Sequence, residues 1–268
     1  MADIALSETD TGSVAVRLRG VTKVYDNGVT ALGPLDLDVA RGEFVSLLGP
    51  SGCGKSTALR LIAGLATPSS GTVSVSHQAG VADRRHSIGF VFQEPTLMPW
   101  ASVQENVRLP LKLSHAPGRE ADARVREALA QVGLAEFADA FPRELSGGMK
   151  MRASLARALV TDPDILLMDE PFAALDEITR FRLNNDLLEL WRNLKKTVVF
   201  VTHSVFESVY LSQRVIVMTS RPGRIATEFR IDTPEPRVED FRMSAGYAGY
   251  CREVSSALSP SYSGVSGA

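Results

Sequence analysis

The sequence has little cysteine, no long apolar run and almost no net charge. Its 268 residues contain two cysteines, Cys53 and Cys251, which excludes a disulfide framework. No uninterrupted apolar stretch approaches the roughly 20 residues needed to cross a bilayer. Met1 to Asp10 has no apolar segment, so we expect no secretory signal. The net charge of −2 gives no support to a general polyanion-binding surface. Together these absences favour a cytosolic protein.

Apolar residues follow two patterns along the chain. Val14–Leu18 and Leu35–Val39 alternate apolar and polar positions, which predicts half-buried antiparallel strands at the N-terminal end. Continuous apolar runs predict strands that are buried on both faces, with helical patterns between several of them. These runs are Phe44–Leu48, Ile88–Phe92, Ile165–Met168, Val198–Val201 and Val215–Met218. The alternation predicts an α/β fold with an open, mostly parallel sheet.

The domain organisation follows from where these patterns stop. We expect one domain over residues 14–242, with a flexible N-terminus over residues 1–13. Residues 94–160 contain no strand run and show helical spacing, which predicts a helical subdomain inserted into the α/β core. Residues 243–268 are rich in serine, glycine and alanine, so we expect a poorly ordered C-terminal tail.

A glycine-rich loop follows the run Phe44–Leu48. Its nine residues fit the pattern G-x-x-x-x-G-K-[ST] between a predicted strand and a predicted helix: Gly49, Pro50, Ser51, Gly52, Cys53, Gly54, Lys55, Ser56 and Thr57. Glycines let backbone N–H groups curl around phosphate oxygens, and the following helix points its positive end at the same anion. Lys55 would supply charge to the outer phosphates and Ser56 a hydroxyl to Mg²⁺. The alternative is a glycine-rich structural turn.

Two acidic residues end the run Ile165–Met168. Ligands of α/β sheets bind beyond the carboxyl ends of strands, so Asp169 and Glu170 would face the phosphates. Asp169 is the candidate Mg²⁺ partner, directly or through water. Glu170 is the candidate base or water-orienting group for attack on the γ-phosphate. The alternative is a pair of acids that merely starts a loop.

Three further side chains follow predicted strands or a turn. Gln93 would contact Mg²⁺ or the attacking water, and the alternative is a polar loop residue. The imidazole of His203 would hydrogen-bond the γ-phosphate and align Glu170 with the water, although a lone histidine is usually structural. Tyr25 would stack on adenine, although an aromatic ring in a β turn more often belongs to the core.

Ser146, Gly147 and Gly148 open a second predicted helix. A serine and two glycines at a helix N-terminus form a second candidate anion site. One nucleotide does not need two such sites on one subunit. We therefore expect a two-fold dimer in which each Ser146 loop closes over the nucleotide held by the Lys55 loop of a second copy. The alternative is an ordinary helix with a serine cap.

In this order the motifs resemble those of the nucleotide-binding subunit of ATP-binding cassette (ABC) transporters, over roughly Val14 to Ile231. The resemblance implies a P-loop NTPase core with an N-terminal antiparallel β subdomain and an inserted helical subdomain. It implies ATP and Mg²⁺ as cofactors and an ATPase coupled to transport. By the same resemblance, Tyr25 is the adenine-stacking aromatic residue and Gln93 lies at the hinge with the helical subdomain.

The resemblance also assigns roles to the acids and to the second glycine motif. Asp169 matches the Mg²⁺ acid, Glu170 the catalytic carboxylate and His203 the switch histidine. Ser146–Gly148 matches the signature that binds ATP in trans, and Asp176 matches the aspartate of the dimer interface. The implied partners are a second copy or a homologous subunit, a membrane-spanning permease and, indirectly, a solute-binding protein, with no nucleic acid. The implied location is peripheral, on the cytoplasmic face of the cell membrane.

Three positions depart from the family pattern. The family often has glutamine at Met149, serine at Ala173 and aspartate at Ser204, which bears on hydrogen bonding across the subunits. Other stretches look more specifically like the importers for nitrate, sulfonate and taurine: Phe92–Trp100, Asp169–Asp176, Phe206–Ser212 and Arg221–Ile225. The transported solute is not predicted, because selectivity would lie in the permease and the binding protein.

An apolar cluster follows Gln93 in a proline-flanked loop. Leu97, Met98 and Trp100 would receive a short helix of the membrane-spanning subunit, and packing in the helical subdomain is the alternative. Two other functions use the same phosphate loop. A soluble ABC-type ATPase of nucleic-acid or assembly processes resembles tandem cassettes or carries long coiled coils, which this chain lacks. In a small-molecule kinase the Ser146 motif would have no task.

Overall fold

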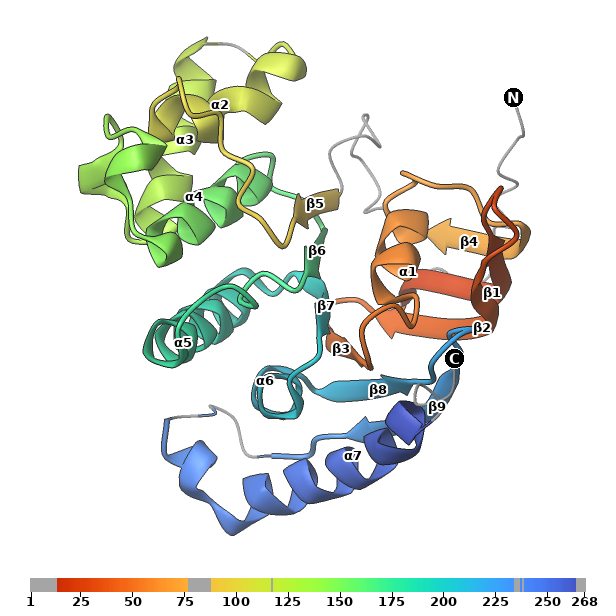
Figure 1. Ribbon diagram of the computed structural model, residues 1–268. Coiled ribbons are helices and arrows are strands. Elements are labelled where there is room, and N and C mark those ends of the chain that lie inside the picture. The colour runs from red at the N-terminus through yellow and green to blue at the C-terminus, as the bar shows by residue number, and fades with distance from the viewer. Residues whose placement is uncertain (1–13, 77–87, 117, 234–236, 238, 264–268) are drawn as a thin grey trace.

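The computed structural model describes residues 14–76, 88–116, 118–233, 237 and 239–263 (Figure 1). The expected flexible segment 1–13 lies outside these residues. A small antiparallel sheet, a larger mixed sheet and a group of helices make up the described fold. This confirms the predicted α/β class with an N-terminal antiparallel β subdomain. None of the described helices combines the length and the hydrophobicity that a membrane span requires.

The antiparallel sheet has the strand order β2–β1–β4, with β1 in the centre. Its strands are β1 (Val14–Val24), β2 (Thr30–Ala40) and β4 (Ser70–Val75). Leu18 of β1 pairs with Leu37 on one side and with Val73 on the other. Leu18 and Leu37 are both buried, as the alternation of polar and apolar residues predicts for a sheet with one buried face.

The larger sheet has the strand order β5–β6–β7–β3–β8–β9. All its neighbouring strands run parallel except β8 and β9, which are antiparallel. The strands are β3 (Phe44–Leu48), β5 (Ile88–Val91), β6 (Ile165–Asp169), β7 (Thr197–Thr202), β8 (Arg214–Met218) and β9 (Ile225–Arg230). Because β6, β7 and β3 are neighbouring parallel strands, their carboxyl ends lie side by side at the same end of the sheet.

Helices cover both faces of this sheet. On one face, Val45 and Leu47 of β3 pack in a core shared with α1 (Lys55–Ile62) and the antiparallel sheet. On the other face, Phe44 and Leu48 join a core that includes residues of α5 (Glu177–Leu194) and α6 (Val205–Leu211). The alternating residues of one buried strand thus face two different cores, which explains why the strand is apolar throughout.

A further group of helices lies beside strands β5 and β6, at one side of the larger sheet (Figure 1). They are α2 (Val103–Leu113), α3 (Gly118–Gln131), η2 (Ala135–Phe137), η3 (Pro142–Glu144) and α4 (Gly147–Leu159). Helix α2 begins with a capping box, in which the Ser102 hydroxyl accepts from the Glu105 N–H and the Glu105 carboxylate from the Ser102 N–H. These helices lie in the stretch that the sequence assigns to the inserted subdomain.

The expectation of a poorly ordered tail is wrong for most of residues 243–268. After η4 (Glu239–Met243) the chain forms helix α7 (Ala245–Ser263), which packs against α6 and β8. Tyr247, Cys251, Val254 and Leu258 are buried at helical spacing on one face of α7. Serine and glycine occupy much of the rest of the helix, so its composition hides this apolar stripe.

Candidate nucleotide-binding site

The loop between β3 and α1 has a backbone that requires glycine. Gly54, the residue before α1, has a φ of 97°. A Cβ at this position would lie 2.7 Å from the carbonyl oxygen of Ala31 and 2.6 Å from a methyl carbon of Leu32. Only glycine adopts this φ readily and lacks the Cβ that would make these close contacts. Helix α1 begins directly after the loop, with its N-terminus facing it.

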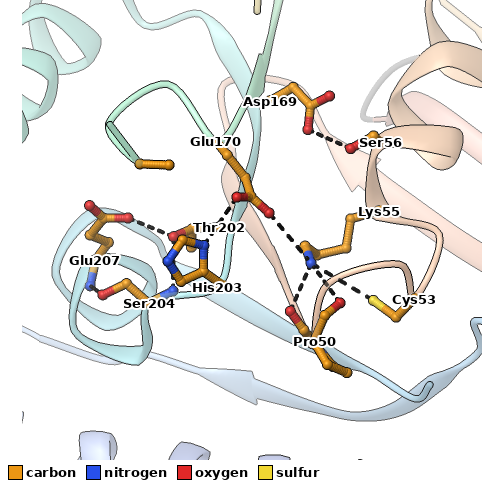
Figure 2. A network of polar contacts seen from close by, with 12 residues as sticks. Pro50, Cys53, Lys55, Ser56, Asp169, Glu170, Thr202, His203, Ser204 and Glu207 are labelled. Carbon is orange, nitrogen blue, oxygen red and sulfur yellow. Dashed lines mark hydrogen bonds and ion pairs between the residues drawn. The ribbon is translucent and has the colours of Figure 1, made fainter. Parts of the chain in front are cut away.

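The amine of Lys55 is held at the centre of this loop (Figure 2). Its Nζ donates to the carbonyl oxygens of Gly49 at 2.7 Å and Pro50 at 3.0 Å. Nζ also lies 3.7 Å from Oε1 of Glu170, and the side chain is 3% exposed. Cys53 is buried beside it, and burial raises the pKa of its thiol.

Ser56 and Asp169 meet across the gap between α1 and the end of β6. Ser56 Oγ donates to Asp169 Oδ1 at 2.7 Å. Burial raises the pKa of Asp169, while the hydrogen bond from Ser56 lowers it. Hydroxyl and carboxylate oxygens are hard ligands, and Mg²⁺ commonly binds one or two protein oxygens together with water and substrate phosphates. The pair fits that chemistry, although no cluster of three potential metal-binding side chains occurs among the described residues.

Glu170 lies between a cation and an imidazole. Its Oε2 is 3.1 Å from Nδ1 of His203, at the end of β7, while Oε1 faces Lys55 (Figure 2). The φ of Glu170 is +46°, and its N–H donates to the carbonyl oxygen of Val201 at 3.0 Å. A left-handed conformation is unfavourable for glutamate, and such strain often occurs at functional sites.

A pocket of about 400 Å³ lies against the phosphate loop. Tyr25, Gln93 and Glu170 line it together with residues of the loop, as the sequence predicts. The Tyr25 hydroxyl is hydrogen-bonded to that of Thr57 at 3.2 Å. Sequence reasoning missed Arg221, which also lines the pocket and whose Nε donates to the Gly52 carbonyl oxygen at 3.3 Å. In the sequence, Arg221 belongs to a segment, Arg221–Ile225, that resembles importers but carries no pattern for a phosphate site.

The second glycine motif and Asp176 do not line this pocket. Ser146 caps α4 by accepting from the Met149 N–H at 3.3 Å, so the structural alternative holds within one chain. Asp176 caps α5 through the Thr179 N–H at 2.9 Å, and this bond lowers the pKa of its carboxyl group. Gly148 allows the close approach of α4 and α5, because a Cβ there would lie 2.8 Å from a methyl carbon of Thr179.

The loop after Gln93 is apolar and partly exposed. Trp100 is 76% exposed, whereas Leu97 is half-buried and packs against the larger core. Core packing within this chain therefore does not account for Trp100. Arg157 holds the loop by donating to the carbonyl oxygens of Pro95 and Thr96, each at 2.8 Å.

The glycine loop, buried lysine, serine–aspartate pair and second carboxylate define a P-loop nucleotide triphosphatase. Residues 32–173 match the family model described as "ABC transporter". This match covers more than half of the chain, which therefore belongs to the ABC transporter family as an ATP-binding, ATP-hydrolysing subunit.

Relatives with assigned roles extend this finding. The chain is 43% identical over 262 residues to a nitrate import ATP-binding protein of Synechocystis, covering 94% of each chain. It is 48% identical over 208 residues to a taurine import ATP-binding protein of Rhizobium johnstonii, covering 78% of this chain and 79% of the relative. A dimeric, post-hydrolysis ATP-binding cassette bound to ADP and phosphate has a TM-score of 0.70 and 36% identity, covering 82% of this chain and 100% of that one.

These comparisons confirm the predicted resemblance to importer subunits and the predicted ATPase. They favour the importer over an ATPase of nucleic-acid or assembly processes, because the two relatives described above are named as import proteins. The dimeric cassette also agrees with the expectation of a partner ATPase subunit.

Proposed function

We propose that this chain powers an importer for a small solute of the nitrate, sulfonate or taurine type, on the cytoplasmic face of the membrane. Relatives of 43% and 48% identity are named as import ATP-binding proteins for nitrate and taurine. A membrane-spanning permease would carry the solute and hold the chain at the membrane, and a solute-binding protein would deliver it. Two copies would bind ATP between them, and hydrolysis would let them separate.

The arrangement of Lys55, Glu170 and His203 carries this proposal. Lys55 would stabilise the charge on the transferred phosphate, and Glu170 would orient or deprotonate the attacking water. His203 would contact the γ-phosphate while its hydrogen bond holds Glu170 in place. Bound Mg²⁺ would neutralise phosphate charge, with Ser56 and Asp169 as its protein partners. Gln93, which lines the pocket, would contact the ion or the water.

The second glycine motif and Asp176, which lie outside the pocket, would act in a dimer, and Tyr25 would act within the pocket. Ser146, Gly147 and Gly148 would close over the nucleotide of a second copy, where the N-terminus of α4 favours an anion. Asp176 would face the second copy, and Tyr25 would stack on adenine beside the phosphate loop. The cap at Ser146 is compatible with this role, because its hydroxyl occupies only one of the free N–H groups of the helix.

Glu170→Gln tests the catalytic assignment. The variant keeps the size and shape of the side chain but loses the carboxylate. It should therefore bind ATP and accumulate as a closed dimer without turnover. Size-exclusion chromatography with ATP and a phosphate-release assay measure the two properties. Glu144→Gln, at an exposed glutamate that caps η3, is the matched control and should behave as the parent chain. Undiminished turnover of Glu170→Gln would overturn the role of Glu170.

The exposed loop around Trp100 is the proposed docking site for the permease. Changing Leu97 and Trp100 to serine should prevent assembly of the transport complex while ATP binding persists. Leu65→Ser is the control, since Leu65 is 63% exposed and lies after α1 rather than in this loop. Normal co-purification of the doubly changed chain with its permease would contradict the docking assignment.

A further inference from the structure

Polar contacts join the loop Ala173–Asp176 to helix α6. Arg180, the fourth residue of α5, donates from Nη2 to the carbonyl oxygen of Leu175 at 2.9 Å and to that of Ala173 at 3.5 Å. Its Nε lies 3.6 Å from Oε1 of Glu207 on α6. One guanidinium group therefore contacts the loop that precedes α5 and a carboxylate of the next helix. Neither Arg180 nor Glu207 lines the nucleotide pocket.

The other carboxylate oxygen of Glu207 continues these contacts to the strand end that carries His203 (Figure 2). Thr202 Oγ1 donates to Glu207 Oε2 at 2.6 Å, and the N–H of Ser204 donates to the same Oγ1 at 3.0 Å. Ser204 Oγ in turn accepts from the N–H of Glu207 at 3.3 Å. His203 is thus flanked by two residues whose positions depend on Glu207.

The burial of Glu207 makes its carboxylate depend on the charge of Arg180. Glu207 is 6% exposed, and burial raises the pKa of its carboxyl group, while the Thr202 bond and the Arg180 charge lower it. A buried carboxylate that loses its cation is strongly destabilised unless it moves or takes up a proton. A displacement of Arg180 therefore changes the environment of Glu207, and with it the backbone around His203.

We propose that Arg180 and Glu207 are positioning residues that couple the loop Ala173–Asp176 to His203. The inference rests on the proposed function, in which Asp176 faces a second copy and His203 contacts the γ-phosphate. Closure of the dimer moves the loop, Arg180 follows the carbonyl groups that it binds, and Glu207 adjusts the strand end at His203. The pair thus makes hydrolysis depend on closure without touching ATP.

A double-mutant cycle on the full chain tests the coupling. Arg180→Met removes the cation, and Glu207→Gln removes the charge but leaves an oxygen that can accept from Thr202. Each single change should lower kcat for ATP hydrolysis about tenfold, a typical size for coupled neighbours, with KM for ATP within about twofold. The double variant should be no slower than the slower single variant. Glu120→Gln, which removes the partner of Arg124 on α3, is the control and should keep the parent kcat.

The outcomes separate coupling from a structural role. Unchanged kcat in folded variants, additive losses in the double variant, or a rise in KM alone would each overturn the coupling. Urea denaturation checks folding, and Arg180→Met carries the test if Glu207→Gln does not fold, because Arg180 is partly exposed. Combined with Glu170→Gln, Glu207→Gln should still form the ATP-dependent dimer, and loss of that dimer would also overturn it.

The parallel Glu170→Gln measurement distinguishes this inference from the proposed function. If the parent chain does not hydrolyse ATP, or if Glu170→Gln retains turnover, the proposed function fails. If Glu170→Gln loses turnover while the Arg180 and Glu207 variants keep it, only the coupling fails.

Discussion

The backbone at Glu170 leads to a prediction about stability. With a φ of +46°, this residue occupies the left-handed region, which costs a residue with a Cβ about 1–2 kcal/mol. Glycine avoids that cost but loses about 0.4–1 kcal/mol more conformational entropy than alanine on folding. Glu170→Gly should therefore be more stable than Glu170→Ala by about 1 kcal/mol, the difference between these two effects. Both variants lack the carboxylate, so its contacts with Lys55 and His203 cancel in the comparison.

Urea denaturation of the nucleotide-free chain is the assay. For 268 residues, 1 kcal/mol corresponds to a shift in Tm of only about 2 °C, so the denaturant midpoint is the better readout. Lys195, which follows α5 with a φ of +51°, provides a matched pair. Lys195→Gly should be more stable than Lys195→Ala by a similar free energy of unfolding, and its urea midpoint should be higher. Equal midpoints for the two Glu170 variants, with a difference at Lys195, would refute the argument about strain.

Activity should fall in both Glu170 variants. Loss of a general base commonly lowers kcat by about 10²–10⁴-fold, and neither glycine nor alanine can replace the carboxylate. Phosphate release at saturating ATP measures the effect. If Glu170→Gly is more stable than Glu170→Ala and both are inactive, the chain tolerates this strained backbone because the carboxylate is needed there. Turnover at the parent rate in either variant would remove Glu170 from the reaction.

Two further predictions concern buried contacts near the site. Burial raises the pKa of Asp169 in the folded protein above its unfolded value of 3.8. The protonated carboxyl group therefore stabilises the folded state below pH 3.8, and this stabilisation is lost as the pH rises through the pKa of the folded protein. Asp169→Asn keeps an acceptor for Ser56 and should resist urea better than the parent at pH 7, with the gap closing toward pH 4, while losing Mg²⁺-dependent turnover. Gly148→Ala places a Cβ 2.8 Å from a methyl carbon of Thr179 and should cost about 1–3 kcal/mol. Gly147→Ala, with 3.2 Å to its nearest neighbour, should cost less, and equal urea midpoints would contradict the packing argument.

The site could be predicted largely because its parts are local and follow a general rule. Strand, loop and helix are contiguous around Lys55, so the pattern of residue types alone predicts that geometry. The pair Asp169–Glu170 and His203 come from distant segments, but each lies at the end of an apolar strand or directly after it. The carboxyl ends of parallel strands meet at one edge of a sheet, and the strand order β6–β7–β3 brings these residues together.

Contacts between distant segments without such a rule could not be predicted. Arg221 follows β8, and no sequence pattern indicates that its side chain reaches the Gly52 carbonyl oxygen. Arg180 and Glu207 lie on two amphipathic helices, where a charged residue is ordinarily solvent-facing. Their pairing depends on how α5 and α6 pack on the sheet, and only the tertiary structure supplies that information.

Helix α7 shows how a correct pattern can be hidden by composition. Tyr247, Cys251, Val254 and Leu258 are separated by four, three and four residues, the spacing of one helical face. Small residues between them weaken the average hydrophobicity, so the composition of the segment predicts disorder where the spacing predicts a helix. Burial of this face against α6 and β8 supplies the stabilisation that serine and glycine do not. For a short apolar stripe beside an existing core, spacing is therefore better evidence of structure than composition.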